Sequence, residues 1–363
     1  METKILNALK WSGLGFLEPL IKLIQGKEKD KNIRLVLRQI VVPVLSVFIF
    51  LGVCNFGASY LYNKERDIKI EKTRSVQGDA AAAQMAECID SSDLSCKPNS
   101  LPSPADVKQG AISLWNDHKM ISEKKSAFKE KTAAINKQRK EQGLKAITYT
   151  GRPSFVDQII TSLKTVFAGF LLAAFFAIPV GIVLGLSETL RSSINWIIQI
   201  LKPVSPVVWL LLVSMVVKTV MANSDSDKAF IISFISVGFC SMWATLVNTT
   251  MGVSSVNPDY INVSKVLRLS VFSNIFKVIL PASIPMIFTG LRITLSVAWM
   301  VLIAIELLAQ SPGLGSFVWE EFQNGANDSN AKIIVAMFVI GFIGFMLDRV
   351  MMFIQKLISF EAK

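Results

Sequence analysis

The chain has 363 residues, of which 52% are hydrophobic and 18% are charged, and its mean hydropathy is +0.47. Globular proteins carry about 25% charged residues, so this composition argues against a soluble enzyme, a disordered chain and a coiled coil, and indicates several lipid-exposed segments. The formal net charge of +11 admits nucleic acid, anionic lipid or an anionic substrate as partner. The single histidine, His118, excludes a histidine-rich metal site, and the four cysteines form no C-x-x-C motif.

The first membrane span is predicted at residues 39–63, where 25 residues carry no charge, because a helix crosses the apolar core of a bilayer in about 20 residues. This stretch begins too far along the chain, and is too long, for a signal peptide, so we expect an uncleaved anchor. The preceding segment, 1–38, is expected on the cytoplasmic side. Its mixture of apolar and polar residues over 4–24 predicts a helix that either lies on the inner membrane surface or packs on its own protein.

Residues 64–157 form a polar insert that is predicted to be periplasmic, with a helix over 106–142. The basic run at 119–140 is either a solvated face, or a surface that meets a partner or stiffens a periplasmic cap. Cys88 and Cys96 are separated by seven residues within the insert. Because the periplasm is oxidising, we expect these two cysteines to form a disulfide.

Five further charge-poor stretches follow along the chain, at residues 165–187, 192–217, 229–258, 278–318 and 333–354. Stretches of this length leave no solvated face for a soluble core helix. The expected fold is therefore an all-α polytopic membrane protein with about six transmembrane helices, whose core spans residues 158–357. Gly181 and Gly185 form a G-x-x-x-G pattern, which favours close contact between helices.

The distribution of lysine and arginine predicts the orientation, because short cytoplasmic segments are enriched in these residues. Residues 1–38 carry a net charge of +4, and the later segments expected inside, 187–202, 251–281 and 348–363, carry +1, +2 and +1. The short segments expected outside, 222–229 and 311–332, carry −1 and −2. Both termini are therefore predicted to be cytoplasmic.

Four polar residues in or near the spans are candidates for the lining of a translocation path: Lys218, Arg292, Glu306 and Gln310. Charged groups inside membrane helices are costly and usually functional. Each charged candidate also has a structural alternative. Arg292 either pairs with Asp348 or faces the path. Glu306 either pairs with a basic group of a neighbouring helix or gates the outer mouth, and Lys218 either reaches the outer interface or attracts an anion.

The sequence contains no G-x-x-x-x-G-K-[ST] motif, so the chain does not by itself bind ATP through a P-loop. No nucleophile has a histidine nearby, and no pair of carboxylates lies in a plausible soluble cleft. We therefore expect neither an enzyme nor a bound cofactor, and the basic charge fits membrane orientation rather than nucleic acid. A channel, a transporter subunit and a membrane anchor remain as alternatives.

The segment 251–281 is the most informative part of the chain. Pro258 and Ser270 mark the limits of a helix within it, and Val263, Val266 and Leu267 recur at helical spacing between them. The pattern predicts a short amphipathic helix on the cytoplasmic surface, held by proline-flanked chain to the next span. This arrangement suits mechanical coupling to a cytoplasmic partner.

The same segment resembles the permease subunits of bacterial ABC importers, whose cytoplasmic loop carries E-A-A-x-x-x-G followed by I-x-L-P. Here Asn262-Val263-Ser264 stands at the E-A-A positions, Arg268 stands at the glycine position, and residues 279–281 read I-L-P. The stretch N-V-S-K-V-L-R-L-S at 262–270 is similar to the nitrate and bicarbonate branch of the nitrate/sulfonate/taurine family. Further motifs of the family occur, in order along the chain, at residues 203–209, 288–293, 304–308, 313–319 and 346–349.

The resemblance implies a permease subunit of the bacterial inner membrane that moves a small anion, nitrate or nitrite first, inward by alternating access. It implies two separate ATP-binding cassette subunits that hold ATP and magnesium, a second permease copy, most simply a homodimer, and a periplasmic or lipid-anchored binding protein. By the resemblance, contact with the ATPase falls at Asn262, Val263, Ser264, Lys265, Leu267, Arg268, Ser270, Leu280 and Pro281.

Alternatives stay open at the level of the substrate and of the energy source. The same family also imports bicarbonate, cyanate, taurine or sulfonates, and a secondary carrier driven by an ion gradient is a different class. For Arg268, pairing with an acidic residue of the ATPase and contact with lipid phosphate are both compatible with the sequence.

Overall fold

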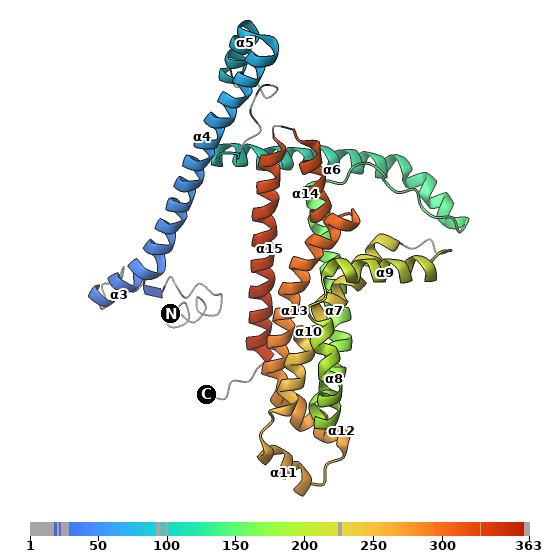
Figure 1. Cartoon of the computed structure of the whole chain (residues 1–363). Helices are drawn as coiled ribbons and strands as arrows, with labels where there is room; N and C mark the ends of the chain where they lie inside the picture. The colour runs from blue at the N-terminus through green and yellow to red at the C-terminus, as the bar shows by residue number, and fades with distance from the viewer. Residues whose placement is uncertain are drawn as a thin grey trace. The chain divides into compact units, whose positions relative to one another are not determined.

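The computed structural model describes residues 29–91, 96, 98, 101–223, 227–326 and 328–358, together with 18, 19 and 22. Every regular element in these residues is a helix (Figure 1). The chain divides into two compact units, Met1–Gln109 and Gly110–Lys363. Apart from residues 18, 19 and 22, the surface helix predicted at 4–24 lies outside the described residues.

The first unit is built on one long helix that contains the predicted first span. Residues Asn32–Gln77 are helical and apolar enough to cross a membrane, whereas the prediction ended the span at residue 63. The helix continues because the residues after 63 are rich in Lys, Glu and Arg, which are good helix formers, and it ends at Gly78, whose φ is 88°. Its parts are α3 (Lys29–Val36), the π turn η2 (Leu37–Val41) and α4 (Val42–Gln77).

Helix α5 (Asp79–Asp90) packs against the C-terminal half of α4. Arg66 of α4 donates to Asp90 at 2.9 Å, and the Lys69 ammonium donates to the carbonyl of Cys96 at 2.8 Å. The structure joins Cys88 to Cys96 by a disulfide. The first half of the predicted insert is therefore a cross-linked helical hairpin on the end of α4.

The core of the second unit consists of α7 (Phe155–Leu186), α10 (Lys228–Ser254), α13 (Leu280–Ala309) and α15 (Ser329–Ile358). Helix α10 packs against both α7 and α13. The approach of α7 to α10 requires the predicted G-x-x-x-G pair, since a Cβ on Gly181 would lie 2.7 Å from the Cβ of Thr249, and one on Gly185 would lie 2.5 Å from that of Val253. Small residues thus set the spacing of the central helices.

The third predicted span, 192–217, is not one continuous helix. The structure has α8 (Glu188–Leu201) and α9 (Pro206–Val220), which are bent by 99° relative to each other. The physical reason is that Pro203 and Pro206 lack the N–H groups that a continuous helix needs at this point. The segment 187–202 is likewise mostly helix α8 rather than loop. Five described helices are long and apolar enough to span a membrane, or six if the bent pair counts as one.

The fifth predicted span, 278–318, has different ends in the structure. The helix begins earlier and runs unbroken over Val271–Ala309, through α12 (Val271–Asn274), the π turn η3 (Ile275–Ile279) and α13. It ends at Gln310, whose φ is 50°, and a separate helix, α14 (Leu314–Asn324), follows. The π turn lies directly before Pro281, where a wider turn accommodates the proline ring, and η2 precedes Pro43 in the same way.

Helix α6 (Pro104–Glu141), the helix predicted over 106–142, crosses the ends of α14 and α15 in the second unit (Figure 1). Its Leu114 is buried with Phe317 of α14 and Ala336 of α15. A Cβ on Gly110 would lie 3.2 Å from that of Ala331, so α6 approaches α15 closely.

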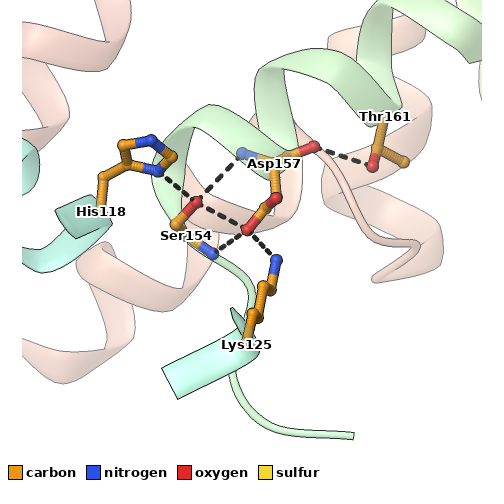
Figure 2. A network of polar contacts seen from close by, with 5 residues as sticks. All are labelled: His118, Lys125, Ser154, Asp157 and Thr161. Atoms are coloured by element: carbon orange, nitrogen blue, oxygen red, sulfur yellow. Dashed lines mark hydrogen bonds and ion pairs between the residues drawn. The ribbon is translucent and has the colours of Figure 1, made fainter. Parts of the chain in front are cut away.

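A polar network fastens α6 to the start of α7 (Figure 2). Ser154 and Asp157 form a reciprocal capping box, in which the Ser154 N–H donates to the Asp157 carboxylate at 2.8 Å. From α6, Lys125 forms an ion pair with the same carboxylate, and the Nδ1 atom of His118 is hydrogen-bonded to the Ser154 hydroxyl at 2.9 Å. This part of the predicted insert is therefore integrated with the membrane core.

Candidate coupling site and membrane charges

At the end of the second unit opposite α6, a short helix projects from the core (Figure 1). This helix, α11 (Pro258–Val266), starts four positions before the family-like fragment 262–270 and ends four positions short of Ser270. The Asn257 side chain caps it by accepting from the N–H of Asp259 at 2.9 Å. Two residues after its end, Arg268 has a left-handed φ of 49°, and the N–H of Leu269 donates to the carbonyl of Ser264 at 3.1 Å.

The chain then turns directly into the long helix that includes α13. Ser270 caps α12, because its hydroxyl accepts from the N–H of Ser273 at 3.3 Å. From Val271 the helix runs without interruption for 39 residues. Only the four residues 267–270 therefore separate α11 from this long helix.

A pocket of about 400 Å³ lies between α11 and the first turns of the long helix. Of the predicted coupling residues, the structure brings Val263, Ser264, Leu267 and Pro281 together in its lining. Three others, Asn262, Lys265 and Arg268, are exposed on the outer side of the helix or turn, as is Ser270, while Leu280 is half-buried against the core.

Apolar side chains around the turn are exposed to a degree that is unusual for their type. Val266 is 82% exposed and Phe272 is 77% exposed, and Leu267 and Val271 are also exposed. A contiguous exposed apolar patch of this kind marks an interface with protein or membrane. The predicted coupling residues include none of Val266, Val271 and Phe272, although the helical spacing had already picked out Val266.

Arg292 of α13 pairs with Asp348 of α15, which is the structural alternative for this residue. The guanidinium donates twice to the carboxylate, with Nη2 lying 2.9 Å from Oδ2. This two-point geometry fixes both side chains and ties the two helices together. Arg292 is thus held by its own chain.

Glu306 is buried, with 1% of its surface exposed, near the far end of α13. The Ser162 hydroxyl of α7 donates to Oε1 at 2.7 Å, and the N–H of Gly315 donates to Oε2 at 2.9 Å. These partners are a hydroxyl and a backbone N–H group, whereas one of the two sequence-based alternatives paired Glu306 with a basic group. The carboxylate instead occupies the start of α14, where backbone N–H groups and the helix dipole favour negative charge.

A glycine makes room for this carboxylate. A Cβ on Gly313 would lie 2.2 Å from the carboxylate carbon of Glu306. The hydroxyl of Ser162 also accepts from the N–H of Leu314 at 2.9 Å. Glu306 and Ser162 therefore join α7, α13 and α14 in a single buried network.

The four candidate path residues do not converge on one site. Arg292 and Glu306 are fourteen residues apart on α13, which corresponds to about 21 Å of helix. Lys218 is exposed in the last turn of α9, and Gln310 is exposed at the end of α13. The two buried or paired charges hold helices together and do not line a common cavity.

Residues 177–361 match the family model described as "Binding-protein-dependent transport system inner membrane component". The match covers the last third of α7 and all the helices that follow it, including α11, the Arg292–Asp348 pair and Glu306.

Two relatives show similarity over a comparable region. The nitrate import permease protein NrtB of Synechococcus elongatus is 36% identical over 202 residues, which are 56% of this chain and 69% of the relative. The bicarbonate transport system permease protein CmpB of a Synechocystis species is 38% identical over 203 residues, 56% of this chain and 68% of the relative. A chain of the MetNI methionine ABC transporter, solved in inward-facing conformations, matches 54% of this chain and 95% of its own length, with 15% identity and a TM-score of 0.42.

Proposed function

The chain belongs to the family of binding-protein-dependent transport system inner membrane components, and from this premise we propose that it imports a small inorganic anion, nitrate first. It is an ABC importer permease of the nitrate and bicarbonate type, and a multi-pass membrane protein. The choice of nitrate is supported by several nitrate permeases among its relatives, whereas bicarbonate is the alternative that other relatives support.

Two ATP-binding cassette subunits supply the energy in this proposal, and α11 is the element that they move. The observation that carries the proposal is the exposed helix α11, which continues through a four-residue turn into a 39-residue membrane helix. The apolar patch around Val266 and Phe272 would be buried in the contact with the ATPase. ATP binding and hydrolysis on the partner would then displace α11 and alternate the access of the membrane core.

In the assembled transporter, α11 faces the cytoplasm and α6 faces the periplasm, with both termini in the cytoplasm. The basic excess in residues 1–38 and 251–281 supports this orientation. A second copy of the chain completes the path, and a periplasmic or lipid-anchored binding protein delivers the anion to the α6 side. The substrate is then selected in large part before it meets the permease.

Co-purification with the cognate ATPase tests the coupling. Replacing Val266 and Phe272 with Asp should abolish a stable complex, because it places charge in an interface that excludes water. Phe322→Asp is the matched control, since this phenylalanine is also exposed but belongs to α14 at the other end of the core. A complex that survives the double substitution, or scrambling of residues 262–270, would contradict the role of α11.

A panel of anions tests the substrate. Binding of nitrate, nitrite, bicarbonate, cyanate, taurine and an alkanesulfonate to the cognate binding protein is measured by calorimetry, followed by uptake into proteoliposomes that contain the complete transporter. ATP-dependent uptake of nitrate supports the proposal. Uptake that persists without the ATPase and follows an ion gradient would place the chain among secondary carriers.

A further inference from the structure

The break between α8 and α9, two helices that together are long and apolar enough for one membrane span, carries a positive charge. Lys202 is exposed at the break, directly before Pro203, and it forms no ion pair within the part of the chain that the structure describes. The positive end of the fifteen-residue helix α9 begins at Pro206. A charged residue in a span is costly and marks a functional site more often than not.

Two tryptophan side chains lie beside this break with free hydrogen-bond donors. Trp209 is in the first turn of α9, Trp243 is on α10, and their ring centroids are 6.5 Å apart. The Nε1 atoms of both are buried and have no hydrogen-bond partner within the described residues. Trp243 is only 6% exposed. Buried indole N–H groups nearly always have an acceptor, and among the described tryptophans only Trp319, on α14, shares this lack.

Trp243 lies near the middle of α10, a helix long and apolar enough to span a membrane. Trp243 is fifteen residues from the first residue of α10 and eleven from the last, which places it about 22 Å and about 16 Å from the two ends of the helix. The ring of Trp209 is stacked on Phe239, with centroids 5.4 Å apart and planes within 5°. The indoles are thus fixed by aromatic packing.

The helices on the two sides of the break and α10 carry no acidic residue apart from Glu188, the first residue of α8. Residues 189–223 and 228–258, which include α9, α10 and all but the first residue of α8, contain no acidic residue. The group that satisfies these donors must therefore supply oxygen acceptors without coming from a carboxylate on the neighbouring helices. A small oxyanion has this chemistry, and charge-assisted hydrogen bonds to it are the strong kind.

We propose that Lys202, Trp209 and Trp243 form an intramembrane binding site for a small inorganic oxyanion, at the break between α8 and α9. The indole N–H groups donate to the oxygens of the anion, while the Lys202 ammonium and the start of α9 compensate its charge. A discontinuous helix near the middle of the membrane suits this task because its end offers a partial charge where a continuous helix offers none. This inference rests on the proposed function, since it assigns the site at which the same anion crosses.

Fluorine NMR observes the donors directly. The complete transporter, in nanodiscs, is labelled with 5-fluorotryptophan at its seven tryptophans per chain and titrated with sodium nitrate or sodium bicarbonate, with sodium gluconate as the ionic-strength control. Two resonances should shift saturably with the oxyanion, and assignment by Trp209→Phe and Trp243→Phe should identify them. The absence of saturable shifts at these two positions would overturn the proposal.

Transport provides the second measurement. Trp209→Phe, Trp243→Phe and Lys202→Met should each lower ATP-driven uptake about tenfold, the effect of losing one hydrogen bond or charge contact to an anion, and Lys202→Arg should restore most of it. The matched control is Trp319→Phe, because Trp319 also has a buried, unpartnered indole but lies on α14.

The outcomes separate this inference from the proposed function. If the wild-type transporter imports neither nitrate nor bicarbonate with ATP, the proposed function fails. If the wild type is active and the Trp209, Trp243 and Lys202 variants transport at the rate of the Trp319→Phe control, the site is wrong although the function stands.

Discussion

The Oε2 atom of Glu306 lies 2.9 Å from the backbone nitrogen of Gly315, so a carboxylate on α13 caps the start of α14. The same carboxylate accepts from Ser162, which belongs to α7. Three helices therefore meet at one buried carboxyl group, and its partners are a hydroxyl and a backbone N–H group. The arrangement is a structural joint at the end of the core farthest from α11.

Removal of this carboxylate should destabilise the joint. Glu306→Ala leaves the buried Ser162 hydroxyl and Gly315 N–H without their acceptor, at an expected cost of about 2–5 kcal/mol, whereas Glu306→Gln keeps the shape and should cost less. Thermal unfolding of the purified protein in nanodiscs measures the difference. Glu320→Gln, which changes an exposed carboxylate on α14, is the control. Equal melting temperatures for Glu306→Ala and this control would contradict the structural role.

A second joint is expected between α13 and α15, where Arg292 and Asp348 form a two-point ion pair. Asp348→Asn should destabilise the protein by about 1–3 kcal/mol, since a partly buried guanidinium loses its charged acceptor. The exchanged pair, Arg292→Asp with Asp348→Arg, should recover part of the loss. Melting temperatures of Arg292→Asp, of Asp348→Arg and of the exchanged pair give the coupling energy between the two positions. If the exchanged pair loses as much stability as the two single substitutions do together, the two side chains are not coupled and the ion pair does not stabilise the protein.

The extent of the membrane core could be predicted from the sequence, because runs without charge have a direct physical meaning in lipid. Whether such a run forms one straight helix or two helices at an angle could not be predicted. Residues 192–217 read as one apolar stretch, yet Pro203 and Pro206 divide it into α8 and α9 at 99°. Prolines are tolerated in many membrane helices, so their presence alone does not distinguish a kink from a break. That distinction depends on packing against α7 and α10.

The capping box at Ser154 should hold α6 on the core. Asp157→Asn removes the charge that pairs with Lys125 and weakens the box, and we expect α6 to open locally at a cost of about 1–2 kcal/mol. Limited trypsin digestion detects such opening through faster cleavage at the lysines of α6, and hydrogen exchange of its amides gives the free energy. Glu123→Gln on the exposed side of α6 should leave both unchanged. Unchanged protection of α6 in Asp157→Asn would contradict this attachment.

The disulfide should act on the α4–α5 hairpin alone. Its closed loop is short, and the chain-entropy model gives a contribution of about 2.5 kcal/mol for a loop of this size. Replacing Cys88 and Cys96 with Ser should therefore increase amide exchange in α5, while exchange in α7, α10 and α13 stays unchanged. Cys54→Ser with Cys240→Ser is the control, since both are free thiols. Faster exchange throughout the core would show that the hairpin supports more than itself.

The candidate coupling site could be placed from the sequence because its motif is local, and Val263, Ser264, Leu267 and Pro281 do line one pocket. The roles of the membrane charges could not be placed in the same way. Glu306 reads as the partner of a basic group until the fold brings Ser162, 144 positions away in sequence, to its side. The free indole of Trp243 is equally invisible in sequence, because a donor without an acceptor is a property of tertiary packing.

Substitutions of Arg268 can separate the effect of its backbone conformation from that of its side chain. The residue has a left-handed conformation at the position where the family motif has glycine. Arg268→Gly should fold with a stability within about 1 kcal/mol of the wild type, since glycine adopts this conformation without strain. Arg268→Val should lose about 1–2 kcal/mol, because a β-branched residue is disfavoured there. Thermal unfolding of the purified permease distinguishes the two.

The same pair of variants also tests whether the guanidinium contacts the ATPase. If Arg268 pairs with an acidic residue of the partner, Arg268→Gly keeps its melting temperature but loses affinity for the ATPase, and Arg268→Lys restores much of that affinity. Titration of the ATPase onto the permease in nanodiscs measures the dissociation constant. If the affinity of Arg268→Gly equals that of the wild type, the residue serves the turn between α11 and α12 and not the interface.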